Sequence, residues 1–367
     1  MSDYQMQKKL DYTIRLRNIL SELPDFCALY FRAIEPTTSV LTRYGYAVDL
    51  RTFFKFLTSG QIPRYENKQP AELTLSDIES LTSLDIELYL EYISLYKNQT
   101  LEGTKLIENN ERAKSRKLSA IRALFKYLYK KSMIQANCAA LVDTPKLHEK
   151  AIIRLEANEV ADLLDTAEQG SGMSNTQRRY HDSTKVRDVA ILSLFLGTGI
   201  RISELVGIDI NNIDFSGNAF VVTRKGGNQM TLAFGQEVAD ALLAYLEERK
   251  NIIPLSGHED AFFLSMQRKR ITPRAVENLV KKYAQIATPL KKITPHKLRS
   301  TYGTMLYQES GDIYLVADVL GHKDVNTTRK HYAAMTEEKT RLAAKYIKLR
   351  EDDTISENPL PFADNSK

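Results

Sequence analysis

Hydrophobic residues recur every three or four positions through the first part of the chain, which is the spacing of one face of an α-helix. In residues 46–57 such a stripe is formed by Tyr46, Leu50, Phe53, Phe54 and Leu57. Another stripe follows Ser83, which we expect to be the helix N-cap, with Asp85 in the first turn. These patterns predict a helical N-terminal domain.

A further amphipathic helix is predicted over residues 115–131. Its apolar face, which we expect to be buried, consists of Leu118, Ile121, Leu124, Phe125 and Leu128. Much of the remaining circumference is basic, and residues 111–131 hold eight Lys or Arg against one Glu. This pattern indicates either a solvated helix face or a surface that follows nucleic-acid phosphates. In the second case the candidate DNA contacts are Arg112, Lys114, Arg116, Lys117, Arg122 and Lys126.

The helical pattern stops at Pro145 and resumes with Leu155, so we place an interdomain linker near residues 143–154. The expected domains are residues 1–145 and 146–350.

The second domain is predicted to be mainly helical. A polar segment rich in Gly and Ser, residues 170–185, predicts a loop without chemistry. Three short extended runs follow in residues 212–234, and the β-branched run 220–223 before a double glycine predicts a hairpin. After Phe234 the pattern is helical again to about residue 349. The expected fold class is therefore mainly α, with one small antiparallel β-sheet in the C-terminal domain.

The net charge of +5 is unevenly distributed along the chain. Residues 351–367 carry five acids and one lysine, a charge of −4, so the first 350 residues carry +9. We expect an acidic, flexible tail at 351–367 and a basic body that suits a polyanionic partner.

Composition also limits where the protein acts. No apolar run approaches the roughly 20 residues of a membrane span, and the N-terminus has no apolar signal-peptide core. The two cysteines, Cys27 and Cys138, lie far apart in the sequence, which suits inert thiols better than a disulfide framework. We expect a cytoplasmic protein.

Several familiar enzyme motifs are missing from the sequence. There is no GxxxxGK[ST] loop to hold ATP phosphates. There is also no HExxH motif and no Cys/His spacing typical of a metal site. We therefore expect neither a cofactor nor a metal.

Basic groups stand instead at the boundaries of predicted elements. They are Arg201 with Glu204 after the turn GTGI, Lys225 at the hairpin tip, His296 and Arg299 in HKLR, and His322 after Gly321, followed by Tyr332. Each has a purely structural alternative. Arg201 can simply pair with Glu204, Lys225 can be solvated, and Tyr332 can be half-buried on a polar helix face.

Taken together, these groups suit attack on a phosphodiester without a metal. Two arginine forks can hold the non-bridging oxygens and stabilise the charge of the transition state. A lysine can protonate the leaving alkoxide, and a histidine can accept the tyrosine proton or hold the phosphate. The phenol, with an ordinary pKa of about 10, then forms a phosphotyrosyl ester. That ester keeps much of the energy of the broken linkage, so the strand can be rejoined without ATP.

The motifs GTGIRISELVGI, RKGG, HKLR and LGH, followed by a tyrosine, resemble those of the tyrosine site-specific recombinases, the integrase and Xer group. The likeness covers the whole second domain in motif order and is looser in the first. It is strongest to the Xer recombinases that act alone in some Gram-positive bacteria. The resemblance implies a tyrosine recombinase catalytic fold, a helical core-binding domain, and a two-domain clamp around duplex DNA.

The resemblance also implies residue roles. Arg201 and Arg299 would clamp the scissile phosphate, with Glu204 steadying the first arginine. His322 would support the phosphate and the tyrosine.

Lys225 would be the general acid for the 5′-hydroxyl, His296 a general base or phosphate ligand, and Tyr332 the residue that forms a 3′-phosphotyrosine. Two departures from the family pattern stand out. Ser300 replaces a second histidine found in many relatives, and nine residues separate His322 from Tyr332, one more than in many Xer proteins.

The family's partners are duplex DNA and further copies of the chain, four protomers meeting on two sites. A Xer protein that resolves chromosome dimers would often work with a septal DNA translocase. An integrase of a mobile element is the alternative within the family, and a type IB topoisomerase shares the chemistry. A non-catalytic DNA-binding protein would explain the basic helix but neither Tyr332 nor Lys225.

Overall fold

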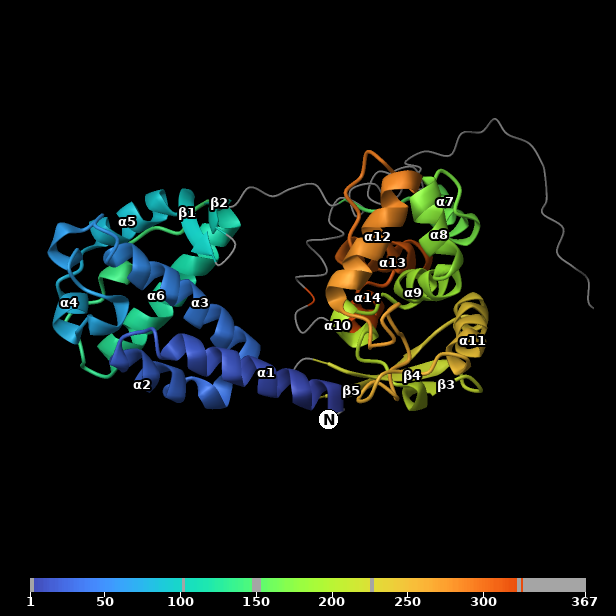
Figure 1. The fold of residues 1–367 in the computed structure, drawn as a ribbon, viewed down its shortest axis with the longest axis horizontal. Helices are drawn as coiled ribbons and strands as arrows, with labels where there is room; N and C mark the ends of the chain where they lie inside the picture. The colour runs from blue at the N-terminus through green and yellow to red at the C-terminus, as the bar shows by residue number, and fades with distance from the viewer. Residues whose placement is uncertain (1–2, 101–102, 147–152, 225–227, 322–324, 326–367) are drawn as a thin grey trace, which may run out of the picture. The chain divides into compact units, whose positions relative to one another are not determined.

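The computed structural model describes residues 3–100, 103–146, 153–224, 228–321 and 325 (Figure 1). The chain divides into two compact units, Met1–Ala151 with Thr223–Gln229 and Ile152–Val222 with Met230–Lys367. Each unit buries its own set of apolar side chains. The predictions for Lys225, His322, Tyr332 and the tail lie outside the described residues.

The first unit is a set of helices around an aromatic-rich core. Its helices are α1 (Asp3–Leu20), α2 (Asp25–Ala33), α3 (Val40–Leu57), α4 (Leu75–Glu79), α5 (Ser83–Tyr92) and α6 (Glu111–Lys130). Short 3-10 turns lie at Glu35–Thr37, Pro63–Tyr65, Pro70–Glu72 and Cys138–Ala140. Helix α3 contacts both α1 and α6. The predicted stripe of α3 is confirmed, since Leu50, Phe53, Phe54 and Leu57 are fully buried, and α6 buries all five of its predicted apolar positions.

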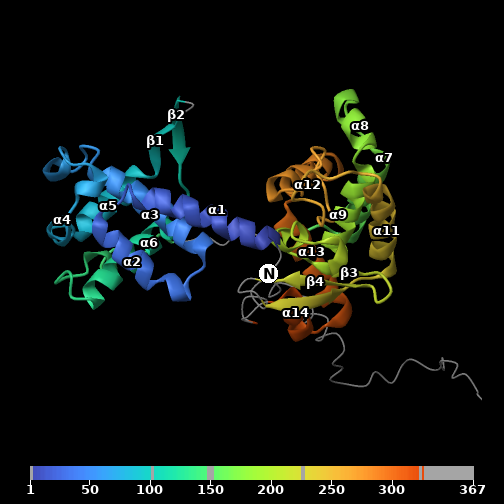
Figure 2. The same cartoon turned by 60° about the horizontal axis from the view of Figure 1, so that its bottom comes forward.

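A two-stranded antiparallel hairpin, β1 (Leu95–Thr100) and β2 (Gly103–Glu108), follows α5 and precedes α6 in the sequence and projects from the helices of the unit (Figure 2). The sequence predicts a sheet only in the second domain, so the prediction is wrong for this part of the first unit. Asn109 closes the base of the hairpin, because its N–H donates to the Ser94 carbonyl at 3.1 Å and its side-chain amide to the Ile93 carbonyl at 2.7 Å. The sequence pattern missed it because the first strand, LYKNQT, is mostly polar and does not alternate.

Helix α5 is capped by Thr82 rather than by Ser83, which is its first helical residue. The Thr82 hydroxyl accepts the Asp85 N–H, and the Asp85 carboxylate accepts the Thr82 N–H at 2.8 Å. Thr82→Ala should therefore lower the free energy of unfolding by about 1 kcal/mol. Ser83→Ala, the matched control, should change it much less. Urea unfolding of both variants measures this, and equal losses would contradict the assignment of the cap.

The second unit surrounds α9 (Lys185–Thr198), whose residues are mostly buried. Three helices contact it: α7 (Ala157–Gln169), α11 (Gln236–Lys250) and α13 (Pro295–Ser310). The remaining helices are α8 (Asn175–Asp182), α10 (Ile202–Leu205), α12 (Pro273–Ala287) and α14 (Ile313–Leu320). Helix α12 contacts α7 and α13, and α14 contacts α13 (Figure 1). Among the described residues, no helix is both long and apolar enough to span a membrane.

The small sheet of this unit has the order β3-β4-β5, with β3 (Ile213–Asp214), β4 (Ala219–Thr223) and β5 (Gln229–Ala233). A 3-10 turn, Ile210–Asn212, precedes it. The rings of Phe220 and Phe234 stack with centroids 5.8 Å apart. The three predicted extended runs and their hairpin are thus confirmed.

The polar segment 170–185 contains helix α8, whereas we predicted a loop. Ser174 and Gln177 form a capping box at its start. At its other end His181 is buried, and its Nε2 lies 2.8 Å from the Ala167 carbonyl oxygen. The helix was missed because it has almost no apolar side chains, so its hydrophobic pattern has no period.

Residues 251–272 also depart from the prediction, because they form no helix. Pro254 and the turn around Gly257, which has a φ of +82°, interrupt the helical pattern. Two buried aromatic residues of this stretch, Phe262 and Phe263, pack against the ring of Tyr245. Their burial in an irregular segment imitates a helical stripe in the sequence.

Candidate active site

Two predicted site residues, Arg201 and Arg299, meet at the C-terminal end of α14. The Arg201 Nη2 donates to the carbonyls of Leu320 at 3.1 Å and Gly321 at 3.0 Å. The Arg299 guanidinium donates to the carbonyls of Gly199 and Leu320. Both arginines therefore share the Leu320 carbonyl. The last carbonyls of a helix lack partners within it and carry partial negative charge, so they suit two cations.

Glu204 holds Arg201 in this position. Its carboxylate accepts the Arg201 Nη1 at 2.9 Å and the Arg201 backbone N–H at 3.0 Å. The side chain of Glu204 is only 4% exposed, whereas that of Arg201 is 35% exposed. The pair expected from the sequence exists, but Arg201 also reaches α14, and its side chain remains partly exposed. Two guanidinium groups and one carboxylate leave a net charge of +1 among these three side chains, which favours an anion.

Arg299 and His296 share α13 but differ in burial. Arg299 is 5% exposed, whereas His296 is exposed in the first turn, directly after Pro295. The Thr294 hydroxyl caps this helix by accepting the Lys297 N–H. We predicted that the histidine and the arginine project from one face. In the structure the arginine lies inside the unit and the histidine lies at its surface.

Gly199 makes the turn between α9 and Arg201. It has a φ of +61°, and a Cβ at this position would lie 2.4 Å from Tyr302 Cδ1 and 2.9 Å from Leu320 Cδ2. The turn GTGI thus needs a residue without a side chain, both for its left-handed backbone and for its close packing. Its carbonyl also accepts Arg299, so this turn links both arginines.

Gly199→Ala should lower the free energy of unfolding by about 1–3 kcal/mol, because it adds backbone strain and overpacking. Gly45→Ala is the matched control. Its Cβ would meet nothing within 4 Å, and it lies inside α3, so it should stabilise by about 0.5–1 kcal/mol. Urea unfolding measures both, and a Gly199→Ala variant as stable as the wild type would contradict this packing.

Tyr302 on α13 lies in the same cluster but is not suited to act as a nucleophile. Burial raises the pKa of its phenol, although nearby Arg299 pulls that pKa down. An activated phenol needs a lowered pKa, which is the opposite direction. Tyr302 instead packs with Tyr307, Val316 and Leu320 between α13 and α14.

The remaining predicted catalytic residues lie outside the described residues, but their flanks are defined. The Arg224 N–H donates to the Asn228 carbonyl at 2.8 Å, and these two residues flank the segment 225–227 in the sequence. Gly321 ends α14 in the left-handed conformation, with φ 60° and ψ 50°, immediately before His322. The roles of Lys225, His322 and Tyr332 stay predictions.

The candidate DNA contacts on α6 divide into two groups. Lys117 is buried and donates to the carboxylate of Asp49 at 3.3 Å. Arg122 donates to the carbonyls of Ala139 and Val142, and to the Thr144 hydroxyl at 2.6 Å. These two side chains therefore bind within their own unit. Arg112, Arg116 and Lys126 are exposed, and Lys114 is partly exposed and pairs with Glu111 at 3.2 Å.

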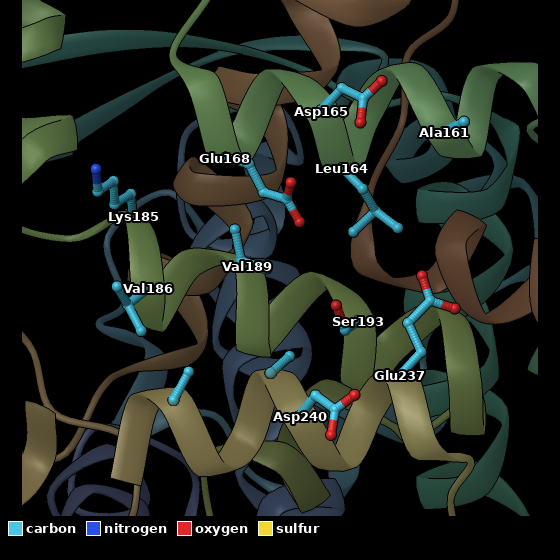
Figure 3. A pocket seen from close by; sticks show the side chains of 12 residues that line it. Ala161, Leu164, Asp165, Glu168, Lys185, Val186, Val189, Ser193, Glu237 and Asp240 are labelled. Atoms are coloured by element: carbon cyan, nitrogen blue, oxygen red, sulfur yellow. The ribbon is translucent and has the colours of Figure 1, made fainter. Parts of the chain in front are cut away.

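A separate groove of about 640 Å³ lies between α7, α9 and α11 (Figure 3). Its apolar floor includes Leu164, Val186 and Val189. Four carboxylates stand around it: Asp165 and Glu168 on α7, and Glu237 and Asp240 on α11. Lys185 also lines the groove, so the charged side chains around it carry a net charge of −3, which disfavours phosphate. No predicted site residue lines the groove. Among the described residues, no group of three or more His, Cys, Asp or Glu is placed to hold a metal ion.

Comparisons with known proteins agree on one family. The sequence profile of the phage integrase family matches residues 153–339. Tyrosine recombinase XerS of Lactococcus lactis subsp. cremoris is 29% identical over 86% of this chain and 93% of its own length. Tyrosine recombinase XerC of Caldanaerobacter subterraneus subsp. tengcongensis is 32% identical over 82% of this chain and 79% of its own length.

Solved structures show the same fold. The XerH recombinase bound to its difH substrate has a TM-score of 0.58 at 19% identity, covering 83% of this chain and 80% of that one. A lambda integrase dimer bound to a core site has a TM-score of 0.55 at 18% identity, covering 82% and 94%. The chain therefore belongs to the phage integrase family, as an enzyme of the Xer type of tyrosine recombinase.

Proposed function

We propose that this enzyme cleaves and rejoins duplex DNA at a specific site through a 3′-phosphotyrosine on Tyr332, without metal or ATP. The observation that carries the proposal is the pair of guanidinium groups, Arg201 and Arg299, that share the Leu320 carbonyl. Two positive charges held at a helix end beside a largely buried carboxylate, Glu204, form a preorganised site for a phosphate.

In the proposed reaction, the Tyr332 oxygen attacks the scissile phosphorus while its proton passes to a base, for which His296 is the candidate. The bond to the 5′-oxygen breaks, and Lys225 protonates that oxygen. Arg201 and Arg299 balance the charge that builds on the non-bridging oxygens, and His322 supports the phosphate. The reverse steps join a new 5′-hydroxyl to the 3′-phosphate and free the tyrosine.

We further propose that residues 1–145 form the DNA-binding domain and residues 146–350 the catalytic domain. Four protomers would assemble on two DNA sites. Similarity to relatives named XerS and XerC favours the resolution of chromosome dimers in the cytoplasm, in which a septal DNA translocase would be a partner. An integrase of a mobile element is the second candidate, because the Tn1549 transposon integrase shares the fold with a TM-score of 0.61.

The test is covalent trapping of DNA. Protein expressed in cells is denatured in SDS, and the DNA that stays attached is sequenced. We expect an adduct that maps to one chromosomal locus. With purified protein and a duplex that carries this locus, the adduct should also form in the presence of EDTA and without ATP. Adducts at the ends of a mobile element would favour the integrase. Relaxation of a plasmid without any enriched site would indicate a topoisomerase, and DNA binding without an adduct would refute the enzyme mechanism.

A further inference from the structure

Helix α6 carries a stripe at positions i, i+4, i+7, i+11, i+14 and i+18 that is exposed at every position except i+11, which is partly buried. These positions are Arg112, Arg116, Ser119, Ala123, Lys126 and Lys130. The two ends of the stripe are basic and its middle is small, so the helix backbone can approach a partner most closely at the middle. The major groove of B-DNA, about 12 Å wide, accepts an α-helix.

One residue of the stripe, Arg116, donates a hydrogen bond to a buried carboxylate, that of Asp49. Asp49 on α3 is 0% exposed, and its carboxylate accepts the Arg116 Nη1 and, at 3.3 Å, the Lys117 Nζ. The side chain of Arg116 nevertheless remains 54% exposed. One edge of the guanidinium is therefore fixed inside the unit. The other edge, Nε and Nη2, is a pair of parallel donors.

The buried carboxylate is costly, which suggests a role beyond stability. Burial raises the pKa of Asp49, although Lys117 and Arg116 pull that pKa down. Buried ion pairs can often be replaced by apolar side chains without loss of stability. An apolar residue at position 49 could not, however, hold a guanidinium in one orientation.

We propose that Arg116 reads a guanine in the DNA target and that Asp49 is the residue that positions it. This inference rests on the proposed function, in which residues 1–145, the domain that contains α6, bind duplex DNA. Guanine presents O6 and N7 in the major groove, and these two acceptors match a pair of parallel arginine donors. Asp49 fixes the arginine before binding, so less rotamer freedom is lost when the base is contacted.

The neighbouring basic residues suit a different task. Arg112 and Lys126 are exposed toward the two ends of the stripe, and neither pairs with an acid among the residues that the structure describes. Flexible cations of this kind follow phosphates, which carry no sequence information. Arg116 differs from them because Asp49 fixes the orientation of its guanidinium. A donor pair in a fixed orientation can distinguish one base pair from another.

The inference can be tested by selecting binding sites from a library of random duplexes with the full-length protein at fixed salt. The wild type should enrich a motif with a G·C pair whose replacement weakens binding roughly 5- to 150-fold. Arg116→Lys keeps the charge and the Asp49–Lys117 pair, so it should fold and retain the salt dependence of binding. It should lose the preference at that one position only.

Two further variants separate the roles. Asp49→Asn should weaken the preference at the same position, and its far-ultraviolet circular dichroism shows whether it remains folded. Lys126→Gln, the matched control, should keep the whole motif, weaken binding to all sequences alike and reduce the salt slope by about 1.

An Arg116→Lys variant with an unchanged motif would overturn the inference, as would one that weakens all sequences alike. If the wild type forms SDS-resistant adducts but enriches no G·C position, the inference fails and the proposed chemistry stands. If it binds no duplex at all, the proposed function fails with it.

Discussion

Tyr332→Phe should form no SDS-resistant protein–DNA adduct on a nicked duplex substrate, while binding the same duplex as tightly as the wild type. Phenylalanine lacks the oxygen that would form the ester with the 3′-phosphate, and no other part of the proposed site supplies one. The loss should therefore be complete rather than partial. Gel electrophoresis in SDS measures the adduct, and a mobility shift without SDS measures binding.

The neighbouring tyrosines provide the controls. Tyr314→Phe and Tyr346→Phe make the same chemical change on either side and should leave the adduct intact. An undiminished adduct in Tyr332→Phe would remove that residue as the nucleophile. A lost adduct in Tyr346→Phe, with Tyr332 unchanged, would move the nucleophile to the later residue.

Arg299→Ala should slow DNA cleavage by about 10²–10³-fold in single-turnover experiments, which is the usual cost of removing one donor to a developing oxyanion. Its guanidinium lies beside that of Arg201 at the end of α14, so it is fixed before any substrate arrives. Such a contact stabilises the transition state more than the bound substrate. The rate of cleavage should consequently fall far more than the affinity for DNA.

This variant also leaves the carbonyls of Gly199 and Leu320 without a donor that they have in the wild type, at a cost of about 1–3 kcal/mol. Cleavage must therefore be measured at a temperature where thermal unfolding shows both proteins folded. Arg274→Ala is the matched control, because that side chain is 80% exposed on α12 and pairs only with Glu277 among its described partners. A rate loss in Arg299→Ala no larger than in Arg274→Ala would exclude the clamp.

The predictions from sequence succeeded where structure is local. The apolar stripes of α3 and α6 and the hairpin after Phe220 were predicted because burial repeats with the period of the element. Prediction from the hydrophobic pattern failed where a helix lacks apolar residues and where an irregular segment happens to have helical spacing. Helix α8 has too few apolar residues to show a helical period, and the buried phenylalanines of 251–272 only resemble one.

The candidate site shows the same division. The glycine turn before Arg201 and the helix start before Arg299 can be recognised in the sequence, because both depend on a few adjacent residues. The carbonyl of Leu320, in contrast, carries no side-chain signal. A main-chain acceptor that joins two arginines, about a hundred residues apart in sequence, is produced only by the packing of α13 and α14 in the second unit.

The chemical inventory of this protein, its helical character and the order of its basic motifs follow from neighbouring residues along the chain. Whether each basic side chain is buried or exposed does not follow from its neighbours in the sequence. Arg116 and Lys117 are adjacent and equally basic, yet one faces solvent and the other is buried, because a helix turns by about 100° per residue and an acid 68 positions earlier lies beneath it. Long-range packing decides which charges are available to a partner and which hold the fold together.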